Sequence, residues 1–464
     1  MSIYKACDIR GRFGSELTVR HARRLGQAVA ALHKPAQVLV GGDGRVSTPS
    51  LKAALIQALL QDGCQVVDVG ILPTPAFYFA RLKLGIQTGI QVTASHNPSQ
   101  DNGFKIILGA LPVTEEEVQA LASWMEAEDL DVEKPGAVIS PGEVIQVDIL
   151  PAYLASLVPL IPDLSGMKVV VDCANGMAGL IARQVWEQTG AQVHYLLEDV
   201  DGTFPGHPPN PAEEKNLSLL KQAVREIRAD LGVAYDGDAD RVLFVDELGR
   251  VVANDKVIVM FAELALKNGP ETIVYDQKCS RVVPDTIRAR GGNPLMERSG
   301  HTFIKTAFLQ HSAAYAGELS GHHFFRQIHG DDGLVTSMFF AQHVYKSGLL
   351  LSALEQLIPI YPITPDIRLP MAPDQIQQLI SDLAENLSAQ AEIRMTDGIR
   401  LEFEHGWALV RPSVTEPVVS LRFEGQDEES LERIMNAVVS ASGLLELCEL
   451  QIPADSSQRR RTGE

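Results

Sequence analysis

Short runs of apolar residues that end in a polar loop recur through the first three-quarters of the chain. The clearest runs begin at Val38, Ile90, Val169, Val233, Ile273 and Ala313, and they lead into GGDGR, TASHNP, DCANG, DGDADR, DQKCS and GELSGHH. A buried strand, a polar loop and an amphipathic helix in succession are typical of α/β domains, which bind ligands at the carboxyl ends of their strands. The pattern therefore predicts an α/β fold whose functional residues lie in these loops.

The C-terminal part of the chain has a different pattern. Two helical stripes are formed by Ile376, Leu379, Ile380, Leu383 and Leu387 and by Leu431, Ile434, Met435, Val438 and Val439. Strand-like segments such as VVSLRFEG lie between the two stripes. We expect a smaller α+β domain here rather than another βαβ unit.

Three interruptions divide the chain. They are a proline- and acid-rich stretch at 126–143, a hairpin-like VLFVDELGRVVAND that ends near residue 250, and the proline-rich segment 359–370. We expect three α/β domains, then the α+β domain, then a frayed tail, over residues 1–146, 147–250, 251–360, 361–450 and 451–464.

The charge balance excludes two classes of partner. The 464 residues carry a formal net charge of −19, which repels the nucleic-acid backbone and anionic lipid. The five cysteines are widely spaced and form no Cys-x-x-Cys motif, so a disulfide framework is not expected and a reducing compartment fits. With no apolar signal segment and no long apolar stretch, we expect a cytoplasmic protein that binds neither nucleic acid nor membrane.

The segment DGDADR places three carboxylates close together. In an extended loop alternate side chains share one side, so Asp236, Asp238 and Asp240 can converge on one hard cation. An EF-hand, with Glu247 at its twelfth position, is excluded because Arg241 replaces the glycine of the sixth position and both flanks resemble strands. A solvated acidic turn is the alternative. The small number of protein oxygens favours Mg²⁺, with room for a phosphate oxygen.

The segment TASHNP places Ser95 after an apolar run, among small polar residues that could leave its hydroxyl exposed. A helix N-cap or turn serine is the alternative, and no Gly-x-Ser-x-Gly surrounds Ser95 to indicate a hydrolase. Ten residues later, Lys105 could supply a cation or a proton; alone, it would be an ordinary surface lysine.

Two further segments combine groups that bind sugars and phosphates. GELSGHH offers the carboxylate of Glu318, the hydroxyl of Ser320 and the imidazole of His322 to neighbouring sugar hydroxyls, with a strand-end turn as the alternative. RPSVTEP joins the guanidinium of Arg411 to two hydroxyls, which could clamp a phosphate or form a plain turn.

Taken in order, these motifs resemble the α-D-phosphohexomutase superfamily, and in particular its bacterial phosphomannomutase/phosphoglucomutase branch. The likeness covers nearly the whole chain, through YKACDIRG, GGDGRVSTP, TASHNP, DCANGMAG, DGDADR, DQKCSR, RSGHTFIK, GELSGHH and RPSVTEP. The resemblance implies three related α/β domains and a smaller C-terminal α+β domain around a central active-site cleft. It also implies a mutase that interconverts hexose 1-phosphate and hexose 6-phosphate of mannose, glucose or both.

The resemblance assigns a role to each candidate residue. Ser95 would carry a phosphoryl group and, with Asp236, Asp238 and Asp240, would bind Mg²⁺. The group would pass to the sugar phosphate and give a hexose 1,6-bisphosphate, and glucose 1,6-bisphosphate would act as the activator. The remaining implied roles are charge neutralisation by Arg10 and Arg241, proton transfer by Lys105 and His322, sugar binding by Lys278, His301, Glu318 and Ser320, and a phosphate clamp formed by Arg411, Ser413 and Thr415.

Three residues depart from the family pattern. Cys7 stands where an aromatic residue is usual, Gly42 where a basic residue is common, and Val414 where glycine or asparagine is usual. We expect Cys7 to loosen the packing around Arg10 and Gly42 to remove one positive charge. We expect Val414 to change the arrangement of backbone donors in the phosphate loop. None of these changes touches the serine, the aspartates or the sugar motif.

Three other functions compete with this hypothesis. A phosphoglucosamine mutase of the same superfamily is the nearest, although GELSGH looks more like the mannose and glucose branch. A sugar-phosphate phosphatase would release inorganic phosphate without a bisphosphate, and a sugar-phosphate-binding regulator would bind without turnover. The sequence leaves the preferred sugar open, as it does the choice between monomer and dimer.

Overall fold

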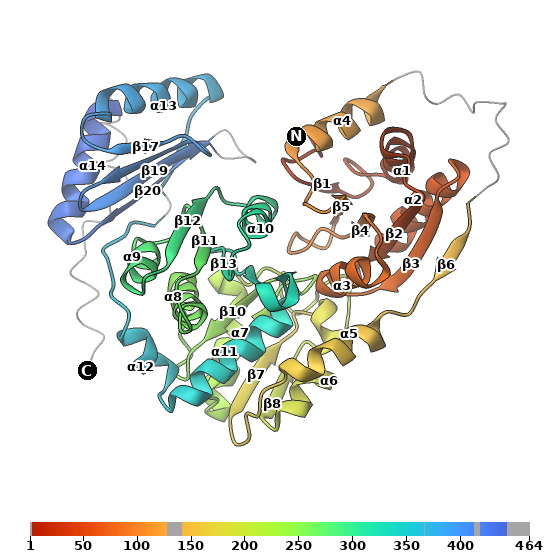
Figure 1. Ribbon diagram of the computed structural model, residues 1–464, viewed down its shortest axis with the longest axis horizontal. Coiled ribbons are helices and arrows are strands. Elements are labelled where there is room, and N and C mark those ends of the chain that lie inside the picture. Colours follow the sequence, from red (N-terminus) through yellow and green to blue (C-terminus); the bar gives the residue numbers. More distant parts are fainter. Residues whose placement is uncertain (1, 128–141, 366, 413–417, 443–464) are drawn as a thin grey trace.

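The chain folds around four β-sheets, each with its own helices (Figure 1). A computed structural model describes residues 2–127, 142–365, 367–412 and 418–442. The four sheets follow one another around an arc, so that the N-terminal and C-terminal units face each other across it (Figure 1). The expected class, three α/β units and a smaller α+β unit, is confirmed. Within the described ranges, no helix is long and apolar enough to cross a membrane.

The first sheet has the order β1-β5-β4-β2-β3-β6 and positions the serine segment. Strands β2, β3, β4 and β6 run parallel, whereas β5 is antiparallel to both β4 and β1. TASHNP therefore leads into a strand rather than into a helix. The elements are β1 Ile9–Arg12, α1 Val19–His33, β2 Gln37–Gly42, α2 Thr48–Gln61, β3 Gln65–Ile71, α3 Thr74–Leu84, β4 Thr88–Val92, β5 Asp101–Leu108, α4 Glu115–Glu126 and β6 Val144–Gln146.

The second sheet, ordered β10-β9-β7-β8, presents the acidic segment between two antiparallel strands. The predicted hairpin is present as well, because Val245 pairs with Val251 beyond the turn that follows β10. The elements are α5 Leu150–Leu157, β7 Lys168–Asp172, α6 Ala182–Trp186, β8 Gln192–Leu196, α7 Ser218–Ile227, β9 Leu231–Tyr235 and β10 Val242–Val245.

The third sheet has the order β12-β11-β13-β14-β15 and carries the GELSGHH segment. Its strand β13 begins only at Tyr315, so the strand expected from Ala313 starts two residues later than the apolar pattern predicts. The elements are α8 Asn254–Ala265, β11 Thr272–Asp276, α9 Val282–Ala289, β12 Asn293–Glu297, α10 His301–Gln310, β13 Tyr315–Gly317, β14 His323–Phe325, β15 Gly330–Asp331, α11 Gly333–Ser347 and α12 Leu351–Gln356.

The fourth sheet is wholly antiparallel, in the order β16-β20-β19-β18-β17. Both predicted helical stripes lie in the two helices of this unit, and their buried members pack into one core with the sheet. The segment VVSLRFEG is strand β20. The elements are β16 Ile367–Pro370, α13 Pro373–Leu387, β17 Glu392–Arg394, β18 Ile399–Phe403, β19 Gly406–Pro412, β20 Val418–Gly425 and α14 Glu428–Ser442.

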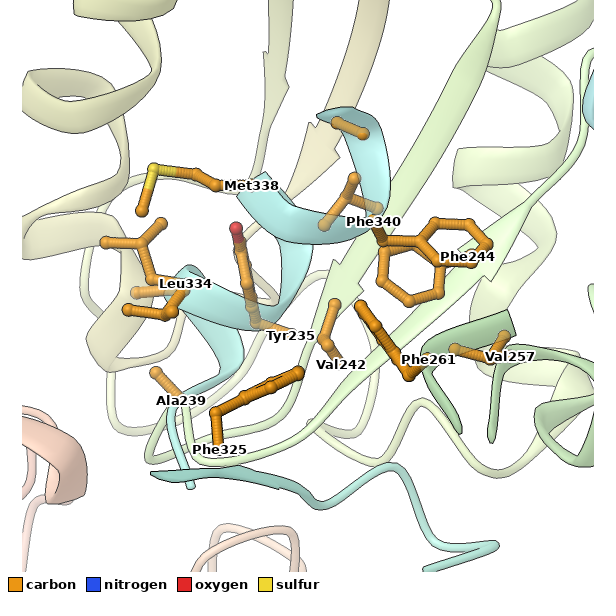
Figure 2. Packing of buried hydrophobic residues seen from close by; sticks show 14 of the residues in the cluster. Tyr235, Ala239, Val242, Phe244, Val257, Phe261, Phe325, Leu334, Met338 and Phe340 are labelled. Atoms are coloured by element: carbon orange, nitrogen blue, oxygen red, sulfur yellow. The ribbon is translucent and has the colours of Figure 1, made fainter. Parts of the chain in front are cut away.

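Helix α11 joins the second and third units. It follows β15 of the third sheet in the chain, yet it packs against β9 and β10 of the second sheet. Its Phe340 stacks on Phe244 of β10 with ring centroids 4.0 Å apart, and Phe261 of α8 packs against Phe340 (Figure 2). This shared core fixes the acidic segment of one unit relative to the sugar segment of the next.

Truncation of this shared core should destabilise the protein strongly. We expect Phe340→Ala to cost about 3–5 kcal/mol of unfolding free energy, because Phe340 is fully buried and its loss leaves a cavity. The matched change Leu357→Ala, at a side chain that is 71% exposed, should cost less than about 0.5 kcal/mol. Thermal unfolding of both variants tests this; equal midpoints would contradict it.

Candidate active site

Ser95 lies in the turn between β4 and β5 in a left-handed backbone conformation, with φ +52°. Such a conformation costs a non-glycine residue about 1–3 kcal/mol unless its surroundings hold it. Here the Ser95 N–H donates to Thr93 Oγ1 at 2.9 Å, and Arg45 Nη2 donates to the Ser95 carbonyl at 2.7 Å. The buried Arg45 also donates to the carbonyls of Asn97 and Pro98. The helix N-cap alternative is wrong, because a strand follows this turn.

The three aspartates converge as predicted, but not through an extended loop. Residues 236–240 form a turn between β9 and β10, with Ala239 at φ +65°. Oxygens of Asp236, Asp238 and Asp240 all lie within 4.8 Å of one another, and the three residues are at most 1% exposed. The solvated-turn alternative is therefore wrong.

The acidic turn lies directly against the serine turn. Ser95 Oγ donates to Asp236 Oδ2 at 2.8 Å. A Cβ at Gly237 would lie 2.4 Å from the Ser95 carbonyl oxygen, so only glycine allows the two backbones this approach. Thr74 Oγ1 from α3 donates to Asp238 Oδ2 at 2.6 Å. The hydroxyl and the carboxylates thus form one cluster across two units.

Lys105 partly neutralises the acidic cluster. From β5 its ammonium donates to Asp238 at 2.6 Å and also to Asp240. Burial alone would lower the pKa of Lys105, but these two carboxylates raise it well above its usual range. Burial raises the pKa of Asp236 well above its ordinary value, and Asp238 and Asp240 add to the effect. Lys105 is therefore a fully charged group inside the site, not an ordinary surface lysine.

The cluster fits a divalent cation. Asp238 Oδ1 and Asp240 Oδ1 are buried and have no hydrogen-bond partner within the part of the chain that the structure describes. Two unpartnered carboxylate oxygens are costly to bury unless a cation compensates them. The donor set of carboxylates and one serine hydroxyl is the hard oxygen set that divalent cations such as Mg²⁺ and Ca²⁺ accept.

A cavity of about 460 Å³ opens beside this cluster. Five of the predicted site residues line it: Arg10, Lys105, Arg241, His301 and His322. Arg10, Lys105 and Arg241 carry positive charge, whereas burial lowers the pKa of His301 to about 4, so that this ring is neutral at neutral pH. The positive charge that an anionic ligand requires is therefore gathered locally in a protein with a formal charge of −19.

Hydrogen bonds and ion pairs hold Arg10 and Arg241, which both line the cavity. Arg10 donates to the Ala94 carbonyl at 3.1 Å and pairs with Asp8 at 2.7 Å. Arg241 Nε donates to His322 Nε2 at 2.8 Å and lies 4.0 Å from Asp236 Oδ2. Both guanidinium groups thus stand next to the serine or acidic turn.

The sugar-segment residues carry unused polar atoms. Glu318 and Ser320 follow β13 in a turn closed by hydrogen bonds from Glu318 N to His322 O and from Gly321 N to Glu318 O. Glu318 Oε2 and Ser320 Oγ are buried and lack a partner among the described residues. The turn expected as the alternative is real, but its polar groups are not satisfied within it.

Lys278 and Arg411 lie outside the lining of the cavity. Lys278 follows β11, and its carbonyl accepts from Arg422 of β20 at 3.1 Å. Arg411 on β19 pairs with Asp397 at 3.0 Å, and Asp397 in turn lies 3.4 Å from Gln277 Nε2. Each of the two predicted residues thus lies where the third and fourth units contact each other. Ser413, Val414 and Thr415 lie outside the described residues.

Two departures from the family pattern can be located. Cys7 is half-buried at the cavity, where its thiol contacts Thr302; burial raises its pKa to about 12. Gly42 is buried, and a Cβ there would lie 2.5 Å from Thr48 Cγ2. The site at Gly42 therefore has no room for the basic side chain that is common in the family.

Sequence reasoning gave no role to three buried charged residues. Arg45 holds the serine turn, Asp331 contacts both His301 and His322, and Lys305 contacts Asp331. Each lies within or close to a segment that the motifs mark, GGDGR, RSGHTFIK or the residues after GELSGHH. A charged residue next to a motif does not reveal its partners, which come from other strands.

Known proteins resemble the chain over almost its full length. Models of the alpha/beta/alpha domains I, II and III and of the C-terminal domain of phosphoglucomutase/phosphomannomutase match residues 1–131, 151–249, 253–361 and 367–441. A phosphomannomutase/phosphoglucomutase of Pseudomonas aeruginosa is 40% identical, with 93% of this chain and 94% of that protein covered. A phosphoglucomutase of Neisseria meningitidis is 36% identical, with coverage of 94% and 95%.

A solved structure agrees with the sequence relatives. The phosphoglucomutase/phosphomannomutase family protein of Burkholderia thailandensis is 35% identical, with 95% of this chain and 97% of that chain covered at a TM-score of 0.85. Domain models and relatives thus agree in order and in extent with the four sheets described above. The chain belongs to the phosphoglucomutase/phosphomannomutase family.

Proposed function

We propose that this protein is a hexose-phosphate mutase that interconverts the 1-phosphates and 6-phosphates of mannose and glucose. The observation that carries the proposal is the Ser95 hydroxyl, 2.8 Å from a buried carboxylate cluster and beside a cavity with cationic walls. The names of the relatives, which include both phosphomannomutase and phosphoglucomutase, support the same activity.

Ser95 is the proposed phosphoryl carrier. A phosphoryl group on Oγ would pass to a sugar hydroxyl, which gives a hexose 1,6-bisphosphate, and the other phosphate would then return to Ser95. Glucose 1,6-bisphosphate would start the cycle on an unphosphorylated enzyme. The held, left-handed serine turn supports this role, because phosphoryl transfer depends chiefly on positioning and charge neutralisation.

Asp236, Asp238, Asp240 and Ser95 are the proposed holders of Mg²⁺. The hard oxygen donors and the two unpartnered carboxylate oxygens support this choice. When bound, the ion supplies positive charge to the transferring phosphoryl group. Arg10 and Arg241 would add charge from the protein on the cavity side.

Lys105 and His322 are the proposed proton-transfer groups. As the sugar oxygen bonds to phosphorus and the bond to Ser95 Oγ breaks, the hydroxyl proton would move to His322 and Ser95 Oγ would take a proton from Lys105. The return transfer reverses both movements, so the protons balance over one cycle. Both side chains line the cavity, which supports this assignment.

The sugar and its second phosphate would bind through the third and fourth units. The unpartnered Glu318 Oε2 and Ser320 Oγ suit the O3 and O4 hydroxyls, which glucose and mannose share. Lys278 and His301 would complete the sugar site. The clamp on the non-reacting phosphate is assigned to Arg411, together with Ser413 and Thr415.

The division of the chain at residues 146, 250, 360 and 450 remains our proposal for its domains. A cytoplasmic location is proposed as well. It is supported by the free thiols of Cys7, Cys64, Cys173 and Cys279, which suit a reducing compartment.

Ser95→Ala should lower turnover by at least about 1,000-fold, because it removes the proposed phosphoryl carrier. Phosphorus NMR would follow the protein with Mg²⁺, glucose 1,6-bisphosphate and either mannose 1-phosphate or glucose 1-phosphate. Growth of the 6-phosphate signal in the wild type alone is expected. The matched change Ser165→Ala, on an exposed turn, should leave the rate unchanged.

Other outcomes of that experiment would contradict the proposal. Accumulation of inorganic phosphate would indicate a phosphatase. Turnover of glucosamine phosphate alone would indicate a phosphoglucosamine mutase. No turnover of any of the three sugars would favour a binding protein.

Asp236→Asn should weaken Mg²⁺ binding by about 10- to 100-fold, since it removes one carboxylate from the cluster. Isothermal titration with Mg²⁺ in the absence of substrate measures this. The control Asp163→Asn changes a carboxylate that serves only an exposed turn with Ser165. Equal Mg²⁺ affinity in all three proteins would show that the cluster does not hold the ion.

A further inference from the structure

Asp331 is a buried carboxylate that contacts two histidines of the cavity lining, and the mechanism above does not use it. It ends the short strand β15 and is 3% exposed. Its Oδ2 lies 2.8 Å from His301 Nε2 and 3.1 Å from His322 Nδ1, and its Oδ1 accepts from Lys305 Nζ at 3.1 Å. Burial alone would raise the pKa of Asp331, but His301 and Lys305 hold it well below its usual range.

The hydrogen bonds of His322 determine which of its ring nitrogens carries the proton. Arg241 Nε points at His322 Nε2 from 2.8 Å, and a guanidinium group can only donate. His322 Nε2 must therefore be unprotonated, and its lone pair accepts this hydrogen bond from Arg241. The neutral ring then carries its proton on Nδ1, which faces two carboxylates, Asp331 Oδ2 at 3.1 Å and Asp240 Oδ1 at 3.7 Å. Only Asp331 is within hydrogen-bond distance, and an ionised carboxylate can only accept.

We propose that Asp331 is the positioning residue of the proton acceptor: its carboxylate fixes His322 as the Nδ1–H tautomer, with the Nε2 lone pair on the Arg241 side of the cavity. This inference rests on the proposed function, in which His322 takes the proton of the attacking sugar hydroxyl. For this transfer Arg241 Nε must release the Nε2 lone pair, which then accepts the proton of the sugar hydroxyl. The ring becomes an imidazolium, and the Asp331 charge stabilises it through the Nδ1–H bond. Asp331 itself keeps its charge and touches no substrate.

The same carboxylate orients His301. The Nε2 of His301 faces only the accepting oxygen of Asp331, so it carries a proton. Tyr78 stacks on the His301 ring at 6.1 Å between centroids, and Lys305 Nζ lies 3.5 Å from the centroid of the Tyr78 ring. One carboxylate thus fixes two histidines and a lysine that line the cavity.

A second cation site is the competing interpretation of this cluster, because Asp240, His301, His322 and Asp331 offer ligand atoms within 4.8 Å of one another. A metal ion would have to replace the N–H protons of both rings. It would also stand beside the Lys305 ammonium, which already pairs with Asp331. Hydrogen bonds to Asp331 account for the arrangement without this repulsion.

The neighbouring Asp332 provides a matched control. It is equally buried, but its carboxylate caps the N-terminus of α11 through the amides of Leu334 and Val335 and accepts from Tyr153 Oη at 2.6 Å. These contacts are structural and do not involve the histidines. A change at Asp332 therefore perturbs the same loop without disturbing the tautomer of His322.

Asp331→Asn should lower kcat roughly 100-fold while KM for glucose 1-phosphate changes less than about threefold, because Glu318, Ser320 and Arg411 do not depend on Asp331 for their positions. Asp332→Asn should lower the thermal midpoint and leave kcat within about twofold. Wild-type kcat in Asp331→Asn, or the same loss of kcat in both variants, would overturn the proposal.

Nitrogen NMR of histidine-labelled protein tests the tautomer directly and does not require turnover. The ring signals that disappear in His322→Gln belong to His322, and in the wild type they should show a protonated Nδ1 and an unprotonated Nε2. In Asp331→Asn the population should shift toward the Nε2–H form. A wild-type His322 protonated at Nε2 would overturn the proposal even if the enzyme is active, whereas absent turnover with the expected tautomer would overturn the proposed function alone.

Discussion

Three aspartate carboxylates buried around one serine hydroxyl impose the main constraint on this structure. Such a cluster would cost several kcal/mol in mutual repulsion and lost hydration if nothing compensated it. Lys105 compensates part of it, and two carboxylate oxygens are left for a cation. The cavity next to the cluster is lined by cationic side chains, which can compensate the negative charge of an anionic ligand. A strongly acidic protein can therefore bind phosphates because its charges are separated locally.

The cluster also explains why several units must be fixed relative to one another. Ser95 and Lys105 come from the first sheet, the aspartates from the second, and the histidines from the third. Gly237 allows the first two to meet, and α11 ties the second to the third through the Phe244 and Phe340 pair. The positioning on which phosphoryl transfer depends is thus a property of the packing between units.

Much of this arrangement could be predicted from the sequence, because the relevant signals are local. The apolar runs predicted the strands, the helical stripes predicted α13 and α14, and DGDADR predicted the acidic cluster. Contacts between units carry no such signal. The partner of Lys105, the role of Arg45 and the link from Asp331 to His322 depend on strand order and on packing. The prediction of an extended acidic loop was wrong, because Ala239 adopts a left-handed backbone conformation and turns the chain. Alanine rarely adopts this conformation, so its presence in the sequence does not predict a turn.

The most direct test of the central claim is to find where the phosphoryl group resides during turnover. The protein would be incubated with glucose 1,6-bisphosphate that carries radioactive phosphate and would then be digested. The labelled peptide would be sequenced by mass spectrometry. The account predicts label on Ser95 that moves into hexose bisphosphate when unlabelled hexose 1-phosphate is added. Label on another residue, or active turnover with no labelled residue, would contradict it.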